Sequence, residues 1–483
     1  MNDFRIPLLL VLSVMSLCAA EVATPLPMDL TLSQVVVDVL AANRDLRVKR
    51  LTPAVAEQSI VENRAAWDPT VSAQVSQGTT IDPRDQRRES RTGTVGLSQS
   101  LPTGTTVEMQ ASTTRTSVEG DPDRAWSTRG EVSVTQSLLK GASLGANLAS
   151  LDQSKLDLRI SRYEVRGLAT SVVFQAENAF WRVYLQERRV LIVRESLDLA
   201  RRFSEETAER IRLGSLAGSE QAAADAEVAS CEADLIDAEA ALDESRLHLL
   251  DLLDLSFTSQ FHTQADPDIL ALGDSIDVLP EHLTVAKARR PDLREAELRR
   301  QRGDLELVRT RNGLLPRLDL FANLGRMGYA DAFAGSTRED DGRSIDARVG
   351  LRFEYLIGNR AAEATHERAR ISIESAQLAL ANLDRLAELD VRLAWAEVKR
   401  AETMRTASIT RVAARAENLR SVAASAEVGR KSPYVVALAQ RDLLQARLDE
   451  AEAAVRIRTS RAALYQSDGS LLQRRGLQAP GGE

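Results

Sequence analysis

The chain has 483 residues, of which 62 are basic and 70 are acidic, so its formal net charge is −8. This negative balance argues against a protein that binds nucleic acid through its charge. Aromatic residues make up 4% of the chain, which is low for a large globular core. The abundance of alanine and of charged residues instead favours long helices that pack closely together.

Residues 1–20 have the pattern of a secretory signal peptide. The apolar run from Ile6 to Ala20 ends in small residues and is too short for a membrane-spanning helix. We therefore expect cleavage after Ala20. Leu17 is bulky where lipoprotein processing at Cys18 requires a small residue, which argues against lipidation. A buried N-terminal helix is the alternative interpretation of this run.

Helix and strand signals alternate through the first half of the mature chain. A capping box begins helical sequence over 31–66, which ends before Pro69. Alternation of apolar and polar residues predicts strands at about 70–78 and 131–140. Between them, an extra hairpin is predicted over 92–113, around a Pro-Thr-Gly turn.

A heptad pattern then predicts a rod-like helix over 142–213. About 70 residues at a rise of 1.5 Å give a rod about 100 Å long, which suits a span across a compartment or a coiled coil. Gly214 breaks the rod, a second helix returns over 219–255, and a linker follows over 256–280. The two apolar rows of the rod are Val165, Val172, Ala179, Val193 and Ala200, and Ala169, Ala176, Val183, Val190, Leu197 and Ile211.

The second half follows the same plan. It reads as a helix at 291–314, strands at about 317–325 and 347–357, a long helix at 359–428, a helix at 433–466 and a flexible tail at 467–483. Three pairs of like residues are each 247 positions apart: Asp45 and Asp292, Pro69 and Pro316, and Gly78 and Gly325. We therefore predict an internal two-fold repeat, with copies over 29–255 and 281–466.

In this arrangement the chain resembles the TolC-like family of outer-membrane efflux proteins. The resemblance rests on the duplicated Asp-Leu helix starts and on the helix-to-strand junctions at 67–71 and 314–318. It rests also on the strand ends at 135–141 and 353–358 and on the Leu-Gly and Val-Gly turns between paired helices. Each motif is short, but their duplicated order covers nearly the whole mature chain.

The resemblance implies a mixed α/β membrane protein that works as a homotrimer in the outer membrane of a Gram-negative envelope. Each chain would give four strands to one transmembrane β-barrel, because four strands cannot close alone whereas twelve can. The long helices would form an α-barrel in the periplasm. The hairpin at 92–113 either extends above the membrane or enlarges the barrel.

The implied function is a passive exit duct of a tripartite efflux or type I secretion system. A periplasmic adaptor (membrane fusion) protein and an inner-membrane transporter of the resistance-nodulation or ATP-binding-cassette type would be its partners. Catalysis is not expected, because no two of the four histidines have metal-ligand spacing and no phosphate loop or nucleophile elbow occurs. We therefore expect no cofactor. The alternative class is a periplasmic coiled-coil adaptor or scaffold without a barrel.

The turns between the paired helices are the candidate adaptor-docking tips. The simpler interpretation is that glycine only closes a helical hairpin there. Glu220 and Lys431 are candidates for a periplasmic gate, although Glu220 also suits a helix N-terminus. Pro69 and Pro316 would mark the helix-to-strand junction at the inner membrane surface. The candidate tip residues are Leu213, Gly214, Ser215, Val428, Gly429 and Arg430.

Overall fold

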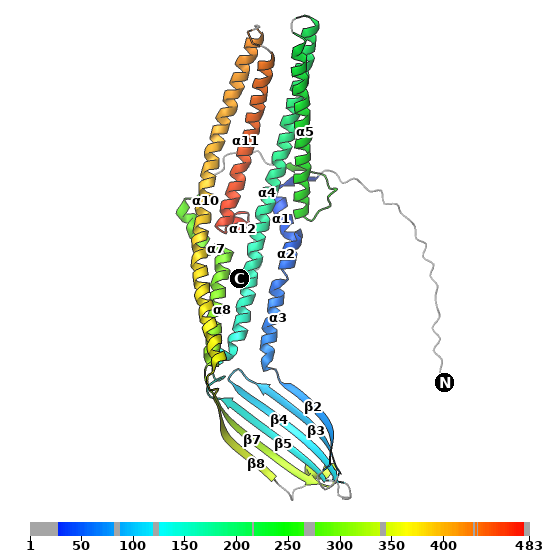
Figure 1. The fold of residues 1–483 in the computed structure, drawn as a ribbon, viewed down its shortest axis with the longest axis vertical. Helices are drawn as coiled ribbons and strands as arrows, with labels where there is room; N and C mark the ends of the chain where they lie inside the picture. The colour runs from blue at the N-terminus through cyan, green and yellow to red at the C-terminus, as the bar shows by residue number, and fades with distance from the viewer. Residues whose placement is uncertain are drawn as a thin grey trace, which may run out of the picture.

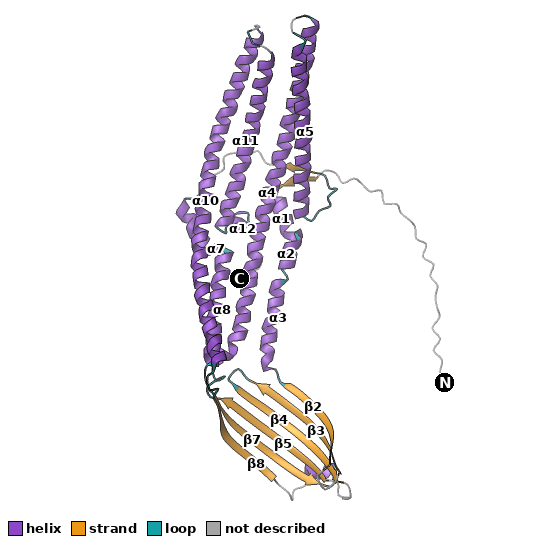
Figure 2. Cartoon of the chain, in the orientation of Figure 1, coloured by secondary structure: helices purple, strands orange, loops and turns teal. Residues whose placement is uncertain are grey.

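The protein is elongated, with long helices at one end and a sheet at the other (Figure 1). Figure 2 shows the same division by secondary structure. The structure is a computed structural model that describes residues 28–81, 87–118, 125–214, 217–264, 276–338, 344–427, 430–431 and 433–477. The predicted signal peptide and its cleavage point lie outside the described residues.

Six strands form one sheet in the order β2-β3-β4-β5-β7-β8, with every neighbouring pair antiparallel. The expected count of four strands per chain is therefore wrong for this sheet. The hairpin expected at 92–113 lies within the sheet, because its strands pair with β2 and β5 along their length. The strands are β2 (Thr70–Ile81), β3 (Arg87–Ser100), β4 (Thr105–Val118), β5 (Ala125–Ser137), β7 (Arg317–Ala330) and β8 (Ser344–Glu354).

Short helices lead into the sheet from the N-terminal side. The helical sequence over 31–66 divides into α1 (Leu32–Ala42), α2 (Arg44–Lys49), α3 (Thr52–Arg64) and the 3-10 turn η1 (Ala65–Trp67). Thr31 and Gln34 form the predicted capping box. The break after α1 is made by Asn43, which has an extended ψ of 125° and accepts a hydrogen bond from the Leu46 N–H at 3.0 Å.

Two long helical hairpins extend away from the sheet. In the first, α4 (Leu144–Arg212) has 69 residues and α5 (Ser219–Leu252) has 34. In the second, α10 (Arg360–Glu427) has 68 and α11 (Pro433–Ser467) has 35. Both hairpins turn at the end far from the sheet (Figure 1). The rise of 1.5 Å per residue makes α4 and α10 about 100 Å long.

The helices form one layer in which α4 is internal. Near the sheet, α4 packs against α3 and α8 (Pro291–Gly313); farther away it packs against α5 and α11. α10 contacts α8, α11 and α7 (Leu279–Arg289) and lies at the edge of the layer (Figure 1). This difference in position explains why α4 buries a long apolar row. The buried members of its predicted heptad rows are Val165, Ala169, Val172, Ala176, Val183, Val190, Leu197 and Ala200.

The main core lies midway along α4. Phe180, Trp181 and Tyr184 are buried and meet edge to face, with ring centroids 5.3 Å and 5.8 Å apart. The core also contains Phe261 of β6 (Phe261–Gln264), which pairs in parallel with β1 (Met28–Thr31). β6 lies inside the segment 256–280 that the sequence predicted as a linker.

The C-terminal segment is packed, not loose. Leu471 and Leu472 of α12 (Leu471–Arg474) are buried in the main core. Arg475 then donates to both carboxylate oxygens of Glu177, at 2.6 and 2.7 Å, and the Glu177 side chain is fully buried. The predicted flexible tail over 467–483 is therefore wrong up to residue 477, because this short segment docks on α4. Residues 478–483 lie outside the described residues.

Candidate functional site

The sheet has one apolar face. Strand residues alternate between faces, so the register groups side chains into rows that cross all six strands. Most apolar side chains on this face are exposed, for example Val75 at 88% and Val349 at 76%. One such row, in strand order, is Val71, Leu97, Met109, Val132, Leu324 and Ala347.

The opposite face of the sheet is polar. Ion pairs join Arg129 to Glu131 at 3.0 Å and to Asp346 at 3.2 Å. A shallow groove of about 430 Å³ lies on this face and contains Glu108 and Arg352 among other polar side chains. The neighbouring polar row, in strand order, is Thr70, Ser98, Glu108, Ser133, Asn323 and Arg348. A sheet with these two faces is suited to a position between an apolar environment and an aqueous one.

The sheet also has two free edges. β2 and β8 are its first and last strands, so each has one side without a partner strand among the described residues. Every residue of β2 is exposed. Long, exposed edge strands are templates for pairing with another chain. Because six antiparallel strands alternate in direction, β8 of one copy would run antiparallel to β2 of the next.

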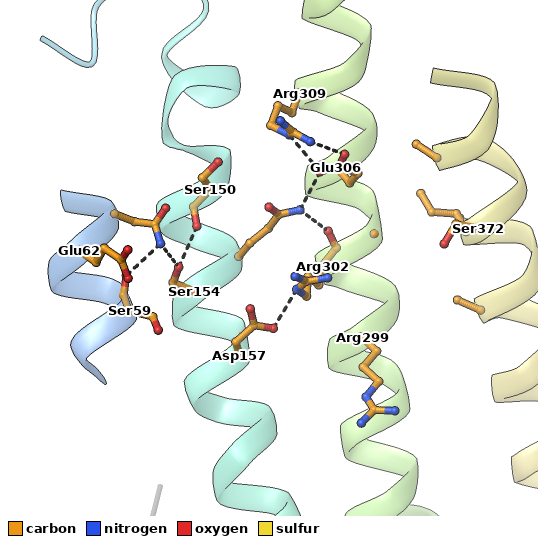
Figure 3. Close-up of a pocket in the computed structure, with 16 residues that line it drawn as sticks. Ser59, Glu62, Ser150, Ser154, Asp157, Arg299, Arg302, Glu306, Arg309 and Ser372 are labelled. Carbon is orange, nitrogen blue, oxygen red and sulfur yellow. Dashed lines mark hydrogen bonds and ion pairs between the residues drawn. The ribbon is translucent and has the colours of Figure 1, made fainter. Parts of the chain in front are cut away.

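A polar groove of about 670 Å³ lies among α3, α4, α8 and α10, close to the sheet. Figure 3 shows its side chains joined across the helices. Asn63 donates to Ser154 at 2.8 Å, and Arg302 pairs with Asp157 at 2.8 Å. The Arg309 guanidinium, by its hydrogen bonds, lowers the pKa of Glu306. Because the opposite charges are paired, the groove is a hydrophilic wall and lacks the excess charge of an ion-binding site.

The candidate tips lie at the end of the molecule farthest from the sheet (Figure 1). Leu213 caps α4 with its side chain 67% exposed. Gly214 has a φ of +72°, which favours glycine, and a Cβ there would meet nothing within 4 Å. Arg430 of the second tip is exposed, and its N–H donates to the Ser425 carbonyl at 2.9 Å. Ser215, Val428 and Gly429 lie outside the described residues.

The two gate candidates are exposed near the tips. Glu220 lies in the first turn of α5, where a carboxylate favours the helix N-terminus. Lys431 belongs to the turn between α10 and α11. No contact places these two side chains together within the part of the chain that the structure describes.

The two prolines lie where helix changes to strand. Pro69 stands between η1 and β2, and Pro316 stands between α8 and β7. The sequence analysis did not single out the residue that holds the β3–β4 turn and the β5–α4 connection at the same end of the sheet. Asn147 near the start of α4 donates to the Pro102 carbonyl at 2.8 Å and to the Gly141 carbonyl at 2.7 Å. In the sequence, only the nearby glycines Gly104 and Gly141 indicated turns at these places. The contact with Asn147 depends on tertiary structure.

No helix among the described residues is both long and apolar enough to cross a lipid bilayer. In the same residues, no three His, Cys, Asp or Glu side chains are grouped as metal ligands.

Comparison with known proteins shows what this chain is similar to. Residues 283–470 match the sequence model of the outer membrane efflux protein family. No curated protein sequence matches the chain significantly. Solved structures show that the resemblance to the TolC-like outer-membrane efflux proteins includes the fold.

The outer-membrane channel OprN is 20% identical, with a TM-score of 0.68 over 91% of this chain and 90% of that chain. The CmeC outer membrane channel of Campylobacter jejuni is 14% identical, with a TM-score of 0.66 over 97% and 94%. The open state of the Neisseria gonorrhoeae MtrE outer membrane channel is 16% identical, with a TM-score of 0.67 over 91% and 89%. The family match over the second half and the shared fold over nearly the whole chain together confirm the predicted resemblance to the TolC-like outer-membrane efflux family.

Proposed function

We propose that this protein is the outer-membrane exit duct of a tripartite efflux or type I secretion system. Three copies would close their sheets into one transmembrane barrel, and their helices would extend the duct into the periplasm. The observation that carries this proposal is the two-faced sheet, which has free edges and is joined directly to a helical layer about 100 Å long.

The apolar face of the sheet supports contact with lipid. A transmembrane strand needs about 9–11 residues when tilted, and the six strands have 11 to 14. Contact with water would be unfavourable for the exposed apolar side chains of this face, such as Val75 and Val349. A soluble periplasmic scaffold, the alternative class, gives no reason for such a face.

The edges of the molecule support assembly from identical copies. β2 and β8 would pair antiparallel between neighbours, and this pairing would satisfy both free edges. α10 has exposed apolar residues along its length, including Leu378 at 67% and Leu393 at 61%. α3 on the other edge exposes Val55 and Val61. These rows would pack against each other between copies.

The tips of the helical hairpins would dock a periplasmic adaptor protein. Leu213 and Gly214 present an exposed leucine and a bare glycine turn, a surface into which another helical hairpin could pack. An inner-membrane transporter would supply the energy through that adaptor. Glu220 and Lys431 would line the periplasmic mouth as its gate. Pro69 and Pro316 would lie at the inner surface of the outer membrane.

The first test combines fractionation of native membranes with reconstitution in planar bilayers. We expect a heat-modifiable trimer from the outer membrane that gives stepwise conductance. A soluble periplasmic species without conductance would overturn the proposal.

Two neighbouring residues of β5 provide a matched test of the lipid-facing side. Val132 is on the apolar face and Ser133 on the polar face. Arginine on a lipid-facing strand costs about 2–4 kcal/mol near the membrane midplane, so Val132→Arg should reduce trimer yield. Ser133→Arg should leave the yield unchanged, because Glu108 lies beside Ser133 on an aqueous face. Equal losses for the two variants would count against a lipid-facing side.

A further inference from the structure

We infer that the β3–β4 hairpin widens the barrel to eighteen strands in the trimer and so admits bulkier cargo than the twelve strands implied by the family resemblance. This inference rests on the proposed function. Its starting point is an asymmetry between the halves: β2 to β5 come from the first half, whereas only β7 and β8 come from the second. The long helices of the two halves correspond in order and length, α4 with α10 and α5 with α11.

The hairpin is a full member of the sheet. β3 pairs with β2 from Ser98 to Arg87, and β4 pairs with β5 from Thr105 to Thr116. Its residues also continue both faces of the sheet. Leu97 and Met109 lie in the apolar row, and Ser98 and Glu108 lie in the polar row. A hairpin that extended above the membrane would have no reason to keep this register.

The turn of the hairpin is fixed to the helical end of the sheet. Asn147 of α4 donates to the Pro102 carbonyl at 2.8 Å, and the Ser137 N–H donates to the Gly104 carbonyl at 2.9 Å. Gly104 has a φ of +80°, and a Cβ there would lie 2.2 Å from the Gly141 carbonyl oxygen. These contacts hold the turn against the start of α4, so the hairpin spans the sheet from end to end.

Two more strands per copy change the size of a closed barrel considerably. With strands about 4.8 Å apart and tilted by about 40°, twelve strands give a backbone diameter of about 24 Å and eighteen give about 36 Å. The cross-section rises about two-fold, and barrels of 16–18 strands enclose an aqueous channel. The added strands therefore enlarge the outer section of the duct.

The chemistry of the added wall indicates the class of cargo. On the polar face, β3 and β4 present mainly uncharged hydroxyl and amide groups, whereas β7 and β8 present Asp319, Asp346, Arg348 and Arg352. A wide wall of neutral polar groups suits bulky, hydrated cargo of either charge, such as an extended polypeptide or a polar polymer. The polar residues of the added strands on this face are Arg88, Ser90, Thr92, Thr94, Ser98, Ser100, Thr106, Glu108, Gln110, Ser112, Thr114 and Thr116.

The test compares the full chain with a variant that lacks residues 87–118. In that variant β2 would pair with β5, to which it is already antiparallel through the order of the sheet. The probes are polyethylene glycols of graded size, added to the external side of single channels in planar bilayers. We expect both proteins to conduct, and we expect the diameter of the largest polymer that enters to fall by about a third in the variant.

Equal polymer cut-offs for two conducting channels would overturn the inference and leave the proposed function intact. If neither protein conducts, the proposed function itself fails. If the deletion variant does not fold, electron cryo-microscopy of the unaltered protein in lipid nanodiscs provides a second measurement. Eighteen strands around the barrel support the inference. A twelve-stranded barrel, whether made by two copies or by exclusion of β3 and β4, overturns it.

Discussion

The two halves of this chain have nearly the same helices but bury them differently. α4 and α10 have 69 and 68 residues, and their partners α5 and α11 have 34 and 35. α4 nevertheless encloses Phe180 and Trp181 in the main core, whereas α10 leaves Leu378 and Leu393 exposed. The difference follows from position, since α4 is internal to the layer and α10 lies at its edge. The two halves therefore share the lengths of their helices, and the elements packed around each helix determine which of its side chains are buried.

Substitution of one tryptophan in each half tests this comparison with the largest expected effect. Trp181 is 1% exposed and packs between Phe180 and Tyr184. Removal of a large buried aromatic ring costs about 3–5 kcal/mol, so Trp181→Ala should lower the thermal midpoint strongly. Trp395 on α10 is only half-buried and donates to the Asp277 carbonyl at 3.4 Å. Trp395→Ala should cost clearly less.

Circular dichroism during heating of the purified assembly measures both midpoints. If Trp395→Ala lowers the midpoint as much as Trp181→Ala does, then the smaller core around Trp395 stabilises the protein as much as the main core does, and the contrast between the halves is wrong.

The comparison also shows what a sequence can and cannot predict. The heptad rows of α4 and the glycine at its tip follow from local spacing, and the structure has the helices at those positions. The position of the hairpin at 92–113 in the sheet could not be predicted from the sequence. Alternation indicates which residues of a strand share a face, but it does not indicate which strand lies beside it. Likewise, Leu471 and Leu472 form too short an apolar run to predict a docked segment. Their burial depends on α4, which is distant in the sequence.

Some candidate site residues can be predicted from local sequence, and the role of others depends on tertiary or quaternary structure. Pro69 and Pro316 were found because proline interrupts helix, and the structure has them between helix and strand. Glu220 and Lys431 were chosen because the family resemblance implies gate residues near the tip turns. Their proposed role depends on the arrangement of several copies, which the sequence of one copy does not contain.

Two glycines that close strand ends give a second, smaller contrast. Gly104 in the first half and Gly358 in the second have φ values of +80° and +87°. A left-handed conformation costs a non-glycine residue about 1–2 kcal/mol, so Gly358→Ala should destabilise by that amount. A Cβ at Gly104 would in addition lie 2.2 Å from the Gly141 carbonyl oxygen, whereas nothing lies within 4 Å at Gly358. Gly104→Ala should therefore cost about 1–3 kcal/mol more.

The temperature at which the proposed trimer dissociates on semi-native gels reports this difference. Equal shifts for the two alanine variants would show that the turn of the extra hairpin is not held against α4.

The smallest effect concerns the ion pair that ties the C-terminal segment to the second half. Arg474 of α12 pairs with Asp277, their side chains are 35% and 41% exposed, and the hydrogen bond from Arg474 lowers the pKa of the Asp277 carboxyl. A carboxyl whose pKa is lowered by folding stabilises the protein above its ordinary pKa, about 4, and loses that contribution as the pH falls.

Exposed pairs of this kind contribute about 0–1 kcal/mol, so Asp277→Asn should destabilise by that amount at pH 7, and the difference should shrink as the pH falls from 7 through the lowered pKa of Asp277. Denaturant unfolding of both proteins across this range measures the difference. The amide introduced by this substitution would keep the shape of the side chain, and the Arg474 guanidinium would still lie over the Tyr465 ring at 4.4 Å. A difference independent of pH would mean that packing, not charge, holds α12 to the second half, in contrast to the buried Glu177–Arg475 pair that holds it to the first.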